Sequence, residues 1–406
     1  LSAPVDTGAI DRQWPRTDGA RCEDCMAPLA DCECLPSVLA MPMGRRTLTR
    51  RAAPVELLSL SVSEVHTLNR CKREYKFGYE AGREPAAPPS LEMRWGSNTH
   101  RGLEGWFLAL QGASPRAADE MLAAVDAHGT DSHGHAYGPP ADPLERAALR
   151  AVLRAYAAYW GESDAAMFEI VAVELHFRMP ILTARGKPMA SGALRDGRID
   201  LLVRERATGA AWVLEHKTTG KEAGNDRFYL GLALDLQIVT YFDVARELGH
   251  DPKGAIYDVL TRPPFDRPLK KAEPKKDGTP RKVSDEDSRS GRPRADEPAA
   301  EYEERLFGII AADVAEGNAA RWFARAKLTF DAAQIAEGRM QFHDAAADVL
   351  TRRRTKRWPI VGDRYVCAKF NEPCPWLRAC LREVPATDEK VYPLKRKNQQ
   401  AMTEGY

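Results

Sequence analysis

The stretches Gly-Arg-Ile-Asp-Leu-Leu-Val-Arg at residues 197–204 and Trp-Val-Leu-Glu-His-Lys at residues 212–217 decide the fold of this chain. Both are rich in branched apolar residues, and the sequence Ala207-Thr208-Gly209 between them is typical of a tight turn. The two stretches therefore predict a β-hairpin, with one strand over residues 199–204 and the next from residue 212 onward.

The segments around this hairpin predict the rest of an α/β fold. Apolar and polar residues alternate over residues 171–178, which predicts a half-buried strand, and residues 255–260 predict another strand. Ser61 followed by Glu64 is typical of the start of a helix. Apolar residues recur at helical spacing in three further segments, at residues 91–111, 143–160 and 229–248. The order of helix, three strands, helix and strand predicts an α/β core with a mixed sheet flanked by helices.

The composition excludes several classes of protein. The 406 residues include 59 Lys and Arg against 58 Asp and Glu, a formal charge of +1, so any basic surface must be local. No run approaches the roughly 18 apolar residues of a membrane span, and we expect a cytoplasmic protein that does not contact a membrane. The chain has no G-x-x-x-x-G-K-[ST] motif, so ATP-driven movement along a substrate would have to come from a partner.

Changes in composition along the chain predict five parts. They are a flexible leader at residues 1–55, the α/β core at 56–265, a charged flexible insertion at 266–300, a helical C-terminal part at 301–390 and a tail at 391–406. The first half of the insertion is basic, and so is the segment 352–357. A solvated linker is the simpler interpretation of the insertion, and contact with a nucleic-acid backbone is the alternative.

The predicted hairpin carries the residues best suited to chemistry. Asp200 and Glu215 are predicted to lie side by side on its two strands, with backbones about 5 Å apart. Two carboxylates at that distance repel each other unless a cation lies between them, and oxygen ligands favour Mg²⁺ or Mn²⁺. Lys217 shares the strand face of Glu215 and can orient an attacking water. A salt bridge among the three side chains is the simpler alternative.

Two helices can bring further side chains to this place. His100 ends the sequence Gly-Ser-Asn-Thr-His on the helix before the sheet, where its imidazole can reach a metal ion. Gln237 and Tyr241 lie four residues apart on the helix after the hairpin, so they share one helix face.

In this order, the four elements G-x-x-x-H, I-D, E-x-K and Q-x-x-x-Y resemble the RecB-type branch of the PD-(D/E)XK nucleases, over residues 60–262. The resemblance implies a restriction-endonuclease-like core and a Mg²⁺ or Mn²⁺ ion. It further implies that His100, Asp200 and Glu215 bind the ion, with the backbone carbonyl of His216 as a further ligand.

The same resemblance implies roles for the remaining residues. Lys217 would serve the hydrolytic water, and Gln237 and Tyr241 would contact the DNA. Glu174, on the strand before the hairpin, is a lesser candidate for the same pocket, because its place in the alternation predicts a solvent-facing side chain.

Four cysteines fit a second feature of some of these nucleases. Cys71 precedes the core, and Cys367, Cys374 and Cys380 follow it. This arrangement resembles the [4Fe–4S] clamp of CRISPR-adaptation nucleases and of nuclease subunits of bacterial recombination complexes. Six residues separate Cys367 from Cys374, where two is the more familiar number. Zinc and four unrelated buried thiols remain as alternatives.

The other four cysteines lie in the leader. Cys22, Cys25, Cys32 and Cys34 form two closely spaced pairs, which predicts a small zinc knuckle or free thiols on an irregular segment.

These observations predict a metal-dependent DNA nuclease that acts as an exonuclease on DNA ends or single strands in recombination, repair or viral genome processing. The combination of core, clamp and basic insertion resembles nucleases carried by bacterial viruses. The alternative is a catalytically silent DNA-binding or adaptor subunit of a helicase or replication complex. A third interpretation keeps the enzyme but makes it an endonuclease.

Overall fold

The computed structural model describes residues 57–395, except 87–88, 131–135, 233, 266–290, 295–296 and 369–372. All described residues belong to one compact unit that begins at Glu56. The leader with its predicted zinc knuckle, most of the charged insertion and the end of the tail lie outside the described residues.

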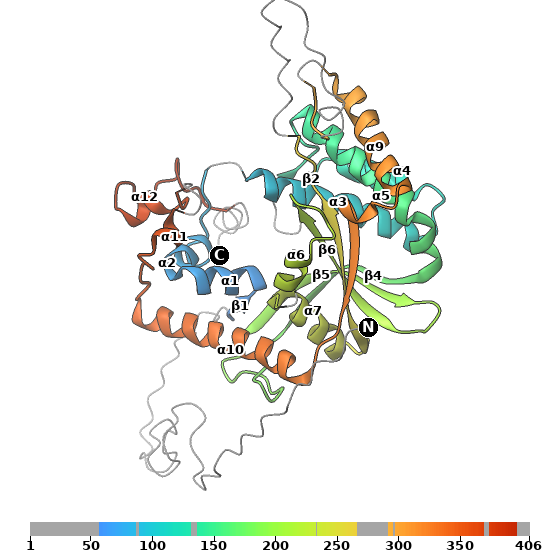
Figure 1. Cartoon of the computed structure of the whole chain (residues 1–406). Helices are drawn as coiled ribbons and strands as arrows, with labels where there is room; N and C mark the ends of the chain where they lie inside the picture. The colour runs from blue at the N-terminus through green and yellow to red at the C-terminus, as the bar shows by residue number, and fades with distance from the viewer. Residues whose placement is uncertain are drawn as a thin grey trace, which may run out of the picture. The chain divides into compact units, whose positions relative to one another are not determined.

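Helices and strands alternate along the chain in the predicted order, and Figure 1 labels most of them. The first half contains β1 (Ser59–Leu60), α1 (Val62–Arg70), α2 (Lys72–Tyr75), a π-helical turn (Lys76–Glu80), α3 (Leu91–Gln111), α4 (Ala117–Asp126), β2 (Gly129–Thr130), β3 (Ala136–Tyr137), α5 (Pro143–Met167) and β4 (Phe168–Pro180). The second half contains β5 (Leu194–Glu205), β6 (Ala211–Thr219), α6 (Asp226–Leu232), α7 (Leu236–Glu247), β7 (Pro252–Thr261), α9 (Ala299–Ala315), a 3₁₀ turn (Ala319–Arg321), β8 (Phe323–Leu328), α10 (Ala332–Thr355), α11 (Arg364–Cys367) and α12 (Leu377–Cys380).

Within the described residues, six strands form one mixed sheet in the order β1-β5-β6-β7-β8, with β4 paired to β5. The hairpin of β5 and β6 is antiparallel and brings Leu201 opposite Leu214. Strand β7 runs parallel to β6, and the connection between them contains α6 and α7. Strands β4 and β8 are antiparallel to β5 and β7. The predicted mixed α/β sheet is therefore confirmed.

Helices cover both faces of this sheet (Figure 1). Helices α3, α4, α5 and α9 pack on one face in an apolar cluster that includes Leu201, Leu214 and Ile256. Helix α7 packs on the other face, where Ile238 and Val244 belong to a cluster with strand residues. Because α3 and α7 lie on opposite faces of the hairpin, they can bring side chains to the hairpin from both sides.

The start of the chain's described part packs against its end. Ser61 caps α1 as predicted: its Oγ accepts from the Glu64 N–H at 3.3 Å, and the Glu64 carboxylate accepts from the Ser61 N–H at 2.6 Å. Helix α1 shares an apolar cluster with α10. Phe77 in the π-helical turn lies 5.3 Å from Trp376, which in turn stacks on Tyr392 at 4.8 Å. These contacts join segments about 300 residues apart, close to the cysteines.

The prediction of one helix over residues 229–248 is wrong in one respect. The segment forms two helices, α6 and α7, and Asp235 starts the second by accepting a hydrogen bond from the Gln237 N–H at 2.9 Å. An Asp side chain satisfies the free N–H groups at a helix start, so a new helix begins where the apolar spacing alone predicts continuation. The predicted end at Gly249 is confirmed, because Gly249 adopts φ 88° directly after α7.

Among the described residues, no helix is long and apolar enough to cross a lipid bilayer.

Candidate active site

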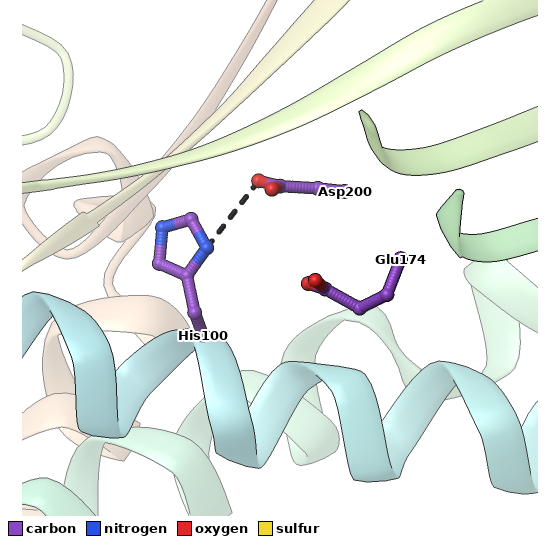
Figure 2. A group of neighbouring side chains, drawn as sticks. All are labelled: His100, Glu174 and Asp200. Carbon is purple, nitrogen blue, oxygen red and sulfur yellow. Dashed lines mark ion pairs between the residues drawn. The ribbon is translucent and has the colours of Figure 1, made fainter. Parts of the chain in front are cut away.

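Three side chains that can bind a metal ion converge from three different elements. His100 comes from α3, Asp200 from β5 and Glu174 from β4, and one ligand atom of each lies within 4.8 Å of the others. His100 Nδ1 is 3.4 Å from Asp200 Oδ2. Figure 2 shows the Glu174 carboxylate reaching toward the other two side chains from the adjacent strand. The predicted approach of His100 to Asp200 therefore exists in the structure.

Glu174 was expected to face solvent, and the structure places it beside Asp200 instead. In the ladder between β4 and β5, Val173 pairs with Leu201 and Leu175 with Ile199, so Glu174 lies opposite Asp200. Its backbone adopts φ 50°, in the left-handed region that a non-glycine residue rarely enters. At this residue the chain departs from strand geometry, so the side chains no longer alternate between the two faces of the sheet. Arg198 donates a hydrogen bond to the Glu174 carboxylate at 2.9 Å.

Glu215 and Lys217 form the centre of a hydrogen-bonded chain that reaches α7. Lys217 Nζ donates to Glu215 Oε1 at 2.9 Å and to Gln237 Oε1 at 2.7 Å. Gln237 Nε2 donates to the Tyr241 hydroxyl at 3.0 Å. The two residues of the predicted Q-x-x-x-Y element thus lie together, and Gln237 contacts the predicted lysine. Asp235 Oδ2 lies 3.8 Å from the same Nζ.

Asp200 connects this chain with the His100 group. It lies next to Glu215 along the hairpin, one position beyond the pair Leu201 and Leu214. Its Oδ2 also accepts from the backbone N–H of His216 at 2.9 Å. Glu215 is only 1% exposed, and its Oε2 has no hydrogen-bond partner. Among the described residues, the compact group of possible metal ligands does not include Glu215, whose Oε1 is paired with Lys217.

The pKa values of two acids of the site, Glu215 and Glu174, are raised. Burial raises the pKa of Glu215 to about 8, and the charge of Asp200 adds to this rise against the opposing effect of Lys217. Burial and Asp200 likewise raise the pKa of Glu174 to about 7. These shifts mean that ionised carboxylates at this place destabilise one another unless a cation accompanies them.

The pKa values of His100 and Asp200 shift in opposite directions. Burial disfavours the charged form of His100, but Asp200 outweighs burial and raises the His100 pKa to about 9. Burial also raises the pKa of Asp200, and His100 with His216 outweighs it, so that the pKa falls to about 2. At Lys217 burial lowers the pKa, and Glu215 outweighs burial and raises it. Lys217 is therefore an ammonium at neutral pH.

These residues fit a hard divalent cation. The donor set is one imidazole and several carboxylate oxygens, which suits Mg²⁺ or Mn²⁺ better than a softer metal. The buried Oε2 of Glu215, which lacks a hydrogen bond, is a polar atom that a cation would satisfy.

The family model described as the PD-(D/E)XK nuclease superfamily matches residues 59–380. The chain belongs to this superfamily. The match extends from β1 to the end of α12, so it includes the sheet, both flanking helices of the site and the second cysteine set. A search of the curated proteins finds no match.

In this nuclease, two of the predicted clamp cysteines, Cys374 and Cys380, pack against an apolar cluster that contains Phe77 and Trp376. Burial raises the pKa of the Cys374 thiol to about 11, and the neighbouring thiols of Cys380 and Cys71 add to the rise. Burial also raises the pKa of Cys380, with contributions from Cys71 and Cys367. The Cys374 N–H donates to the Cys367 carbonyl at 2.7 Å. Segments almost 300 residues apart thus meet beside Cys374 and Cys380.

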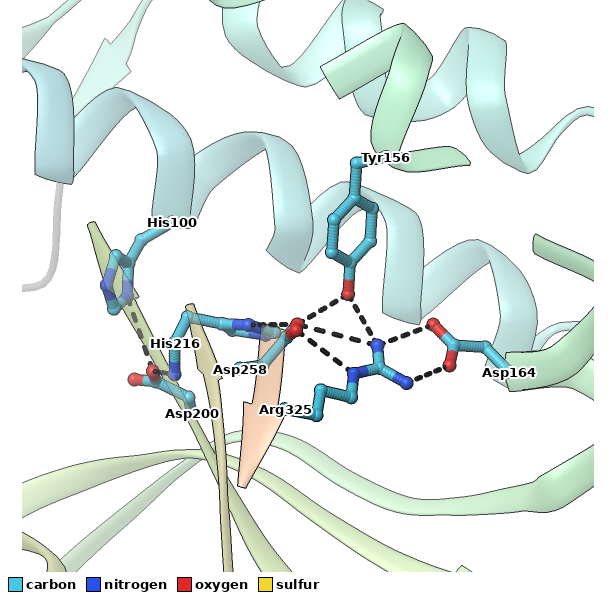
Figure 3. A network of polar contacts seen from close by, with 7 residues as sticks. All are labelled: His100, Tyr156, Asp164, Asp200, His216, Asp258 and Arg325. Carbon is cyan, nitrogen blue, oxygen red and sulfur yellow. Dashed lines mark hydrogen bonds and ion pairs between the residues drawn. The ribbon is translucent and has the colours of Figure 1, made fainter. Parts of the chain in front are cut away.

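One part of the nuclease site was missed by the sequence analysis. Asp258 on β7 contacts His216, and it is paired with Arg325 on β8 (Figure 3). The relevant signal in the sequence is the single acid, Asp258, in the apolar run of β7, but its partner Arg325 is 67 residues away and no local pattern connects them.

Proposed function

We propose that this nuclease is a metal-dependent deoxyribonuclease that acts as an exonuclease on DNA ends or single strands. The observation that carries the proposal is the joint placement of two groups of side chains along one hairpin. His100, Asp200 and Glu174 gather on one side, and Asp200 lies next to the pair of Glu215 and Lys217. Hydrolysis of a phosphodiester needs a cation site and a positive donor close together, and both are present here.

The acids and the imidazole would hold the metal ion. His100, Asp200 and Glu215 would bind it, with Glu174 beside them and the backbone carbonyl of His216 as a further ligand. A bound Mg²⁺ or Mn²⁺ would supply stabilisation of the negative charge that develops on the phosphate.

Lys217 would orient the attacking water and offset phosphate charge. Its ammonium has three N–H groups, and Glu215 and Gln237 accept from two of them. The third N–H is available for the water or for a phosphate oxygen. Gln237 holds Lys217 in this orientation and is itself held by Tyr241, and both residues would contact the DNA strand from α7.

We further propose that Cys71, Cys367, Cys374 and Cys380 hold a [4Fe–4S] cluster. One cysteine precedes the nuclease core and three follow it, and this order, which resembles the clamp of related nucleases, supports a cluster. Such a cluster would join the start of the nuclease domain to its end.

The biological setting belongs to the same proposal. The resemblance to RecB-type and CRISPR-adaptation nucleases, and to those of bacterial viruses, supports a role in recombination, repair or viral genome processing. Because the chain has no P-loop, unwinding of duplex DNA would depend on a helicase partner. A catalytically silent adaptor is the alternative, and the intact set of Asp200, Glu215 and Lys217 favours the enzyme.

The test compares linear and circular single-stranded DNA as substrates with Mn²⁺. An exonuclease degrades only the linear form, and an endonuclease degrades both. Lys217→Ala should abolish most activity, while Lys253→Ala, an exposed lysine on β7 paired with Asp251, should leave it unchanged. DNA binding without cleavage of either substrate would support the adaptor instead.

A further inference from the structure

Three polar side chains lie in one row across the sheet beneath the candidate active site. The strand pairing places His216 of β6 beside Asp258 of β7, and Asp258 beside Arg325 of β8. All three project from the sheet toward α3 and α5, among apolar core residues (Figure 3). Asp258 is fully buried and His216 is 3% exposed.

The Asp258 carboxylate accepts hydrogen bonds from three directions. Tyr156 on α5 donates its hydroxyl at 2.6 Å, Arg325 Nε donates at 3.0 Å, and His216 Nδ1 lies at 3.1 Å. Burial raises the pKa of Asp258, but Arg325 and His216 outweigh burial and hold it well below its usual range. Because the Asp258 carboxylate is paired with the Arg325 guanidinium, which is always charged, it is an acceptor, and His216 Nδ1 lies where it can donate to it.

Arg325 is itself fixed by further contacts. Its guanidinium donates to Asp164 at 3.0 Å and to the Tyr156 hydroxyl at 2.8 Å, and it lies 4.0 Å from the centre of the Trp160 ring. Asp164 is fully buried at the end of α5. The position of Asp258 is therefore determined by groups from α5 and β8 that do not contact the candidate active site.

His216 connects this network with two of the predicted metal ligands. Its backbone N–H donates to Asp200 Oδ2 at 2.9 Å. Its ring meets the His100 ring edge to face, with centres 6.0 Å apart, and stacks on Phe107 at 5.4 Å. A shift of the His216 ring would therefore disturb the imidazole of His100, and a shift of the His216 backbone would disturb the carboxylate of Asp200.

Stability alone is a poor explanation for this arrangement. Removing two carboxylates and a guanidinium from water costs several kcal/mol for each ion, and apolar side chains of similar size often stabilise a core equally well or better. The neighbouring positions of the same sheet face are apolar, as at Leu214 and Ile256. The polar row is thus confined to the place where it can act on His216.

We propose that Asp258, held by Arg325, is a positioning residue of the nuclease, and that it acts through His216, whose ring meets His100 and whose backbone N–H holds Asp200, to fix these two residues for metal binding. The proposal rests on the proposed function in that His100 and Asp200 bind the metal ion. Groups that orient metal ligands from behind commonly contribute about 10–100-fold to metal affinity.

A double-mutant cycle tests this role on the full chain. The dissociation constant for Mn²⁺ is measured by calorimetry, in the absence of DNA, for the parent, Asp258→Asn, His216→Phe and the double variant. Phe keeps the ring that contacts His100 and Phe107 but lacks Nδ1. We expect each single variant to bind Mn²⁺ about 10–100-fold more weakly and the double variant to bind no more weakly than His216→Phe alone.

Two controls separate positioning from general stability. Asp243→Asn removes another buried carboxylate, paired with Arg195 and Arg339 away from the site, and should leave Mn²⁺ affinity unchanged. If Asp258→Asn does not fold, Tyr156→Phe removes one donor to Asp258 without burying a lone charge, and it should weaken Mn²⁺ binding several-fold.

Each outcome decides the matter. The proposal would be overturned if folded Asp258→Asn, or Tyr156→Phe where it replaces that variant, bound Mn²⁺ with the affinity of the parent. It would also be overturned if the losses of Mn²⁺ affinity in the two single variants added up in the double variant. A parent that binds Mn²⁺ with the expected cycle but cleaves no DNA would contradict the proposed function and leave this inference standing. A parent that does not bind Mn²⁺ would overturn both.

Discussion

Lys217 Nζ lies 2.9 Å from Glu215 Oε1, and both side chains leave β6 on the same face, two residues apart. Gln237 lies on α7, in the connection between β6 and β7, and accepts a second hydrogen bond from the ammonium. The arrangement places a positively charged hydrogen-bond donor, the Lys217 ammonium, next to buried acids.

Lys217→Ala should reduce kcat for single-stranded DNA by about 10²–10³-fold, because it removes the donor that orients the water and offsets developing charge. Mn²⁺ affinity should change much less, since the ligands remain. Single-turnover cleavage at saturating Mn²⁺, with Lys253→Ala as the matched lysine control, measures the effect. Equal cleavage rates for Lys217→Ala and the parent would show that Lys217 does not take part in the reaction.

Glu174→Gln should weaken Mn²⁺ binding by about tenfold, because the Glu174 carboxylate lies within reach of His100 and Asp200. Calorimetric titration of the metal measures this. Glu169→Gln on the same strand, where the side chain is exposed, is the control. Identical Mn²⁺ affinities for Glu174→Gln and the parent would show that the Glu174 carboxylate does not contribute to metal binding.

Cys374→Ser should remove the iron from the protein, because it removes one of the four thiolates that would hold the cluster. It should also lower the melting temperature, because the cluster closes a loop of almost 300 residues. The protein is purified without oxygen, and its visible spectrum and iron content are recorded; we expect about four iron atoms per chain in the parent. Cys22→Ser, in the leader, should retain the iron. A colourless parent that contains zinc would contradict the cluster.

Asp243→Asn should destabilise the fold by about 1.5–3 kcal/mol at pH 7, because it removes one of the two carboxylates, Asp243 and Glu247, that are paired with the buried Arg195 guanidinium. Burial raises the pKa of Asp243, but Arg339 and Arg195 outweigh burial and lower it below its usual value. A carboxyl with a lowered folded-state pKa stabilises above its unfolded pKa of about 3.9, and this contribution disappears as the pH falls through the folded value.

The difference in unfolding free energy between Asp243→Asn and the parent should therefore shrink below about pH 4. Urea unfolding at pH 7, 5 and 3 measures it. A difference that stays constant over this range would show that the Asp243 charge does not contribute to stability.

Local patterns in the sequence predict much of this fold. The hairpin follows from two apolar runs around a turn, and the start of α1 follows from Ser61 and Glu64, because each depends on residues within a few positions. The predicted meeting of Glu215, Lys217 and Gln237 also follows, since the strand period of two and the helix face of α7 determine it.

Other features depend on geometry that local patterns do not contain. Glu174 reaches the site only because its backbone leaves the β region, and the alternation gives no indication of this. The contact between Asp164 and Arg325 spans 161 residues and depends on which strands become neighbours. The break between α6 and α7 arises because the side chain of Asp235 caps a new helix within an apolar run that reads as continuous.

Single-turnover cleavage of end-labelled single-stranded DNA, measured for the parent and Asp200→Asn with Mn²⁺ and with EDTA, tests the central claim most directly. The account predicts that the parent cleaves with Mn²⁺ and stops when EDTA removes it, and that Asp200→Asn is slower by at least about 100-fold, since Asp200 connects the ligand group with Glu215. Cleavage by the parent that survives EDTA, or cleavage by Asp200→Asn at the parental rate, would contradict the account.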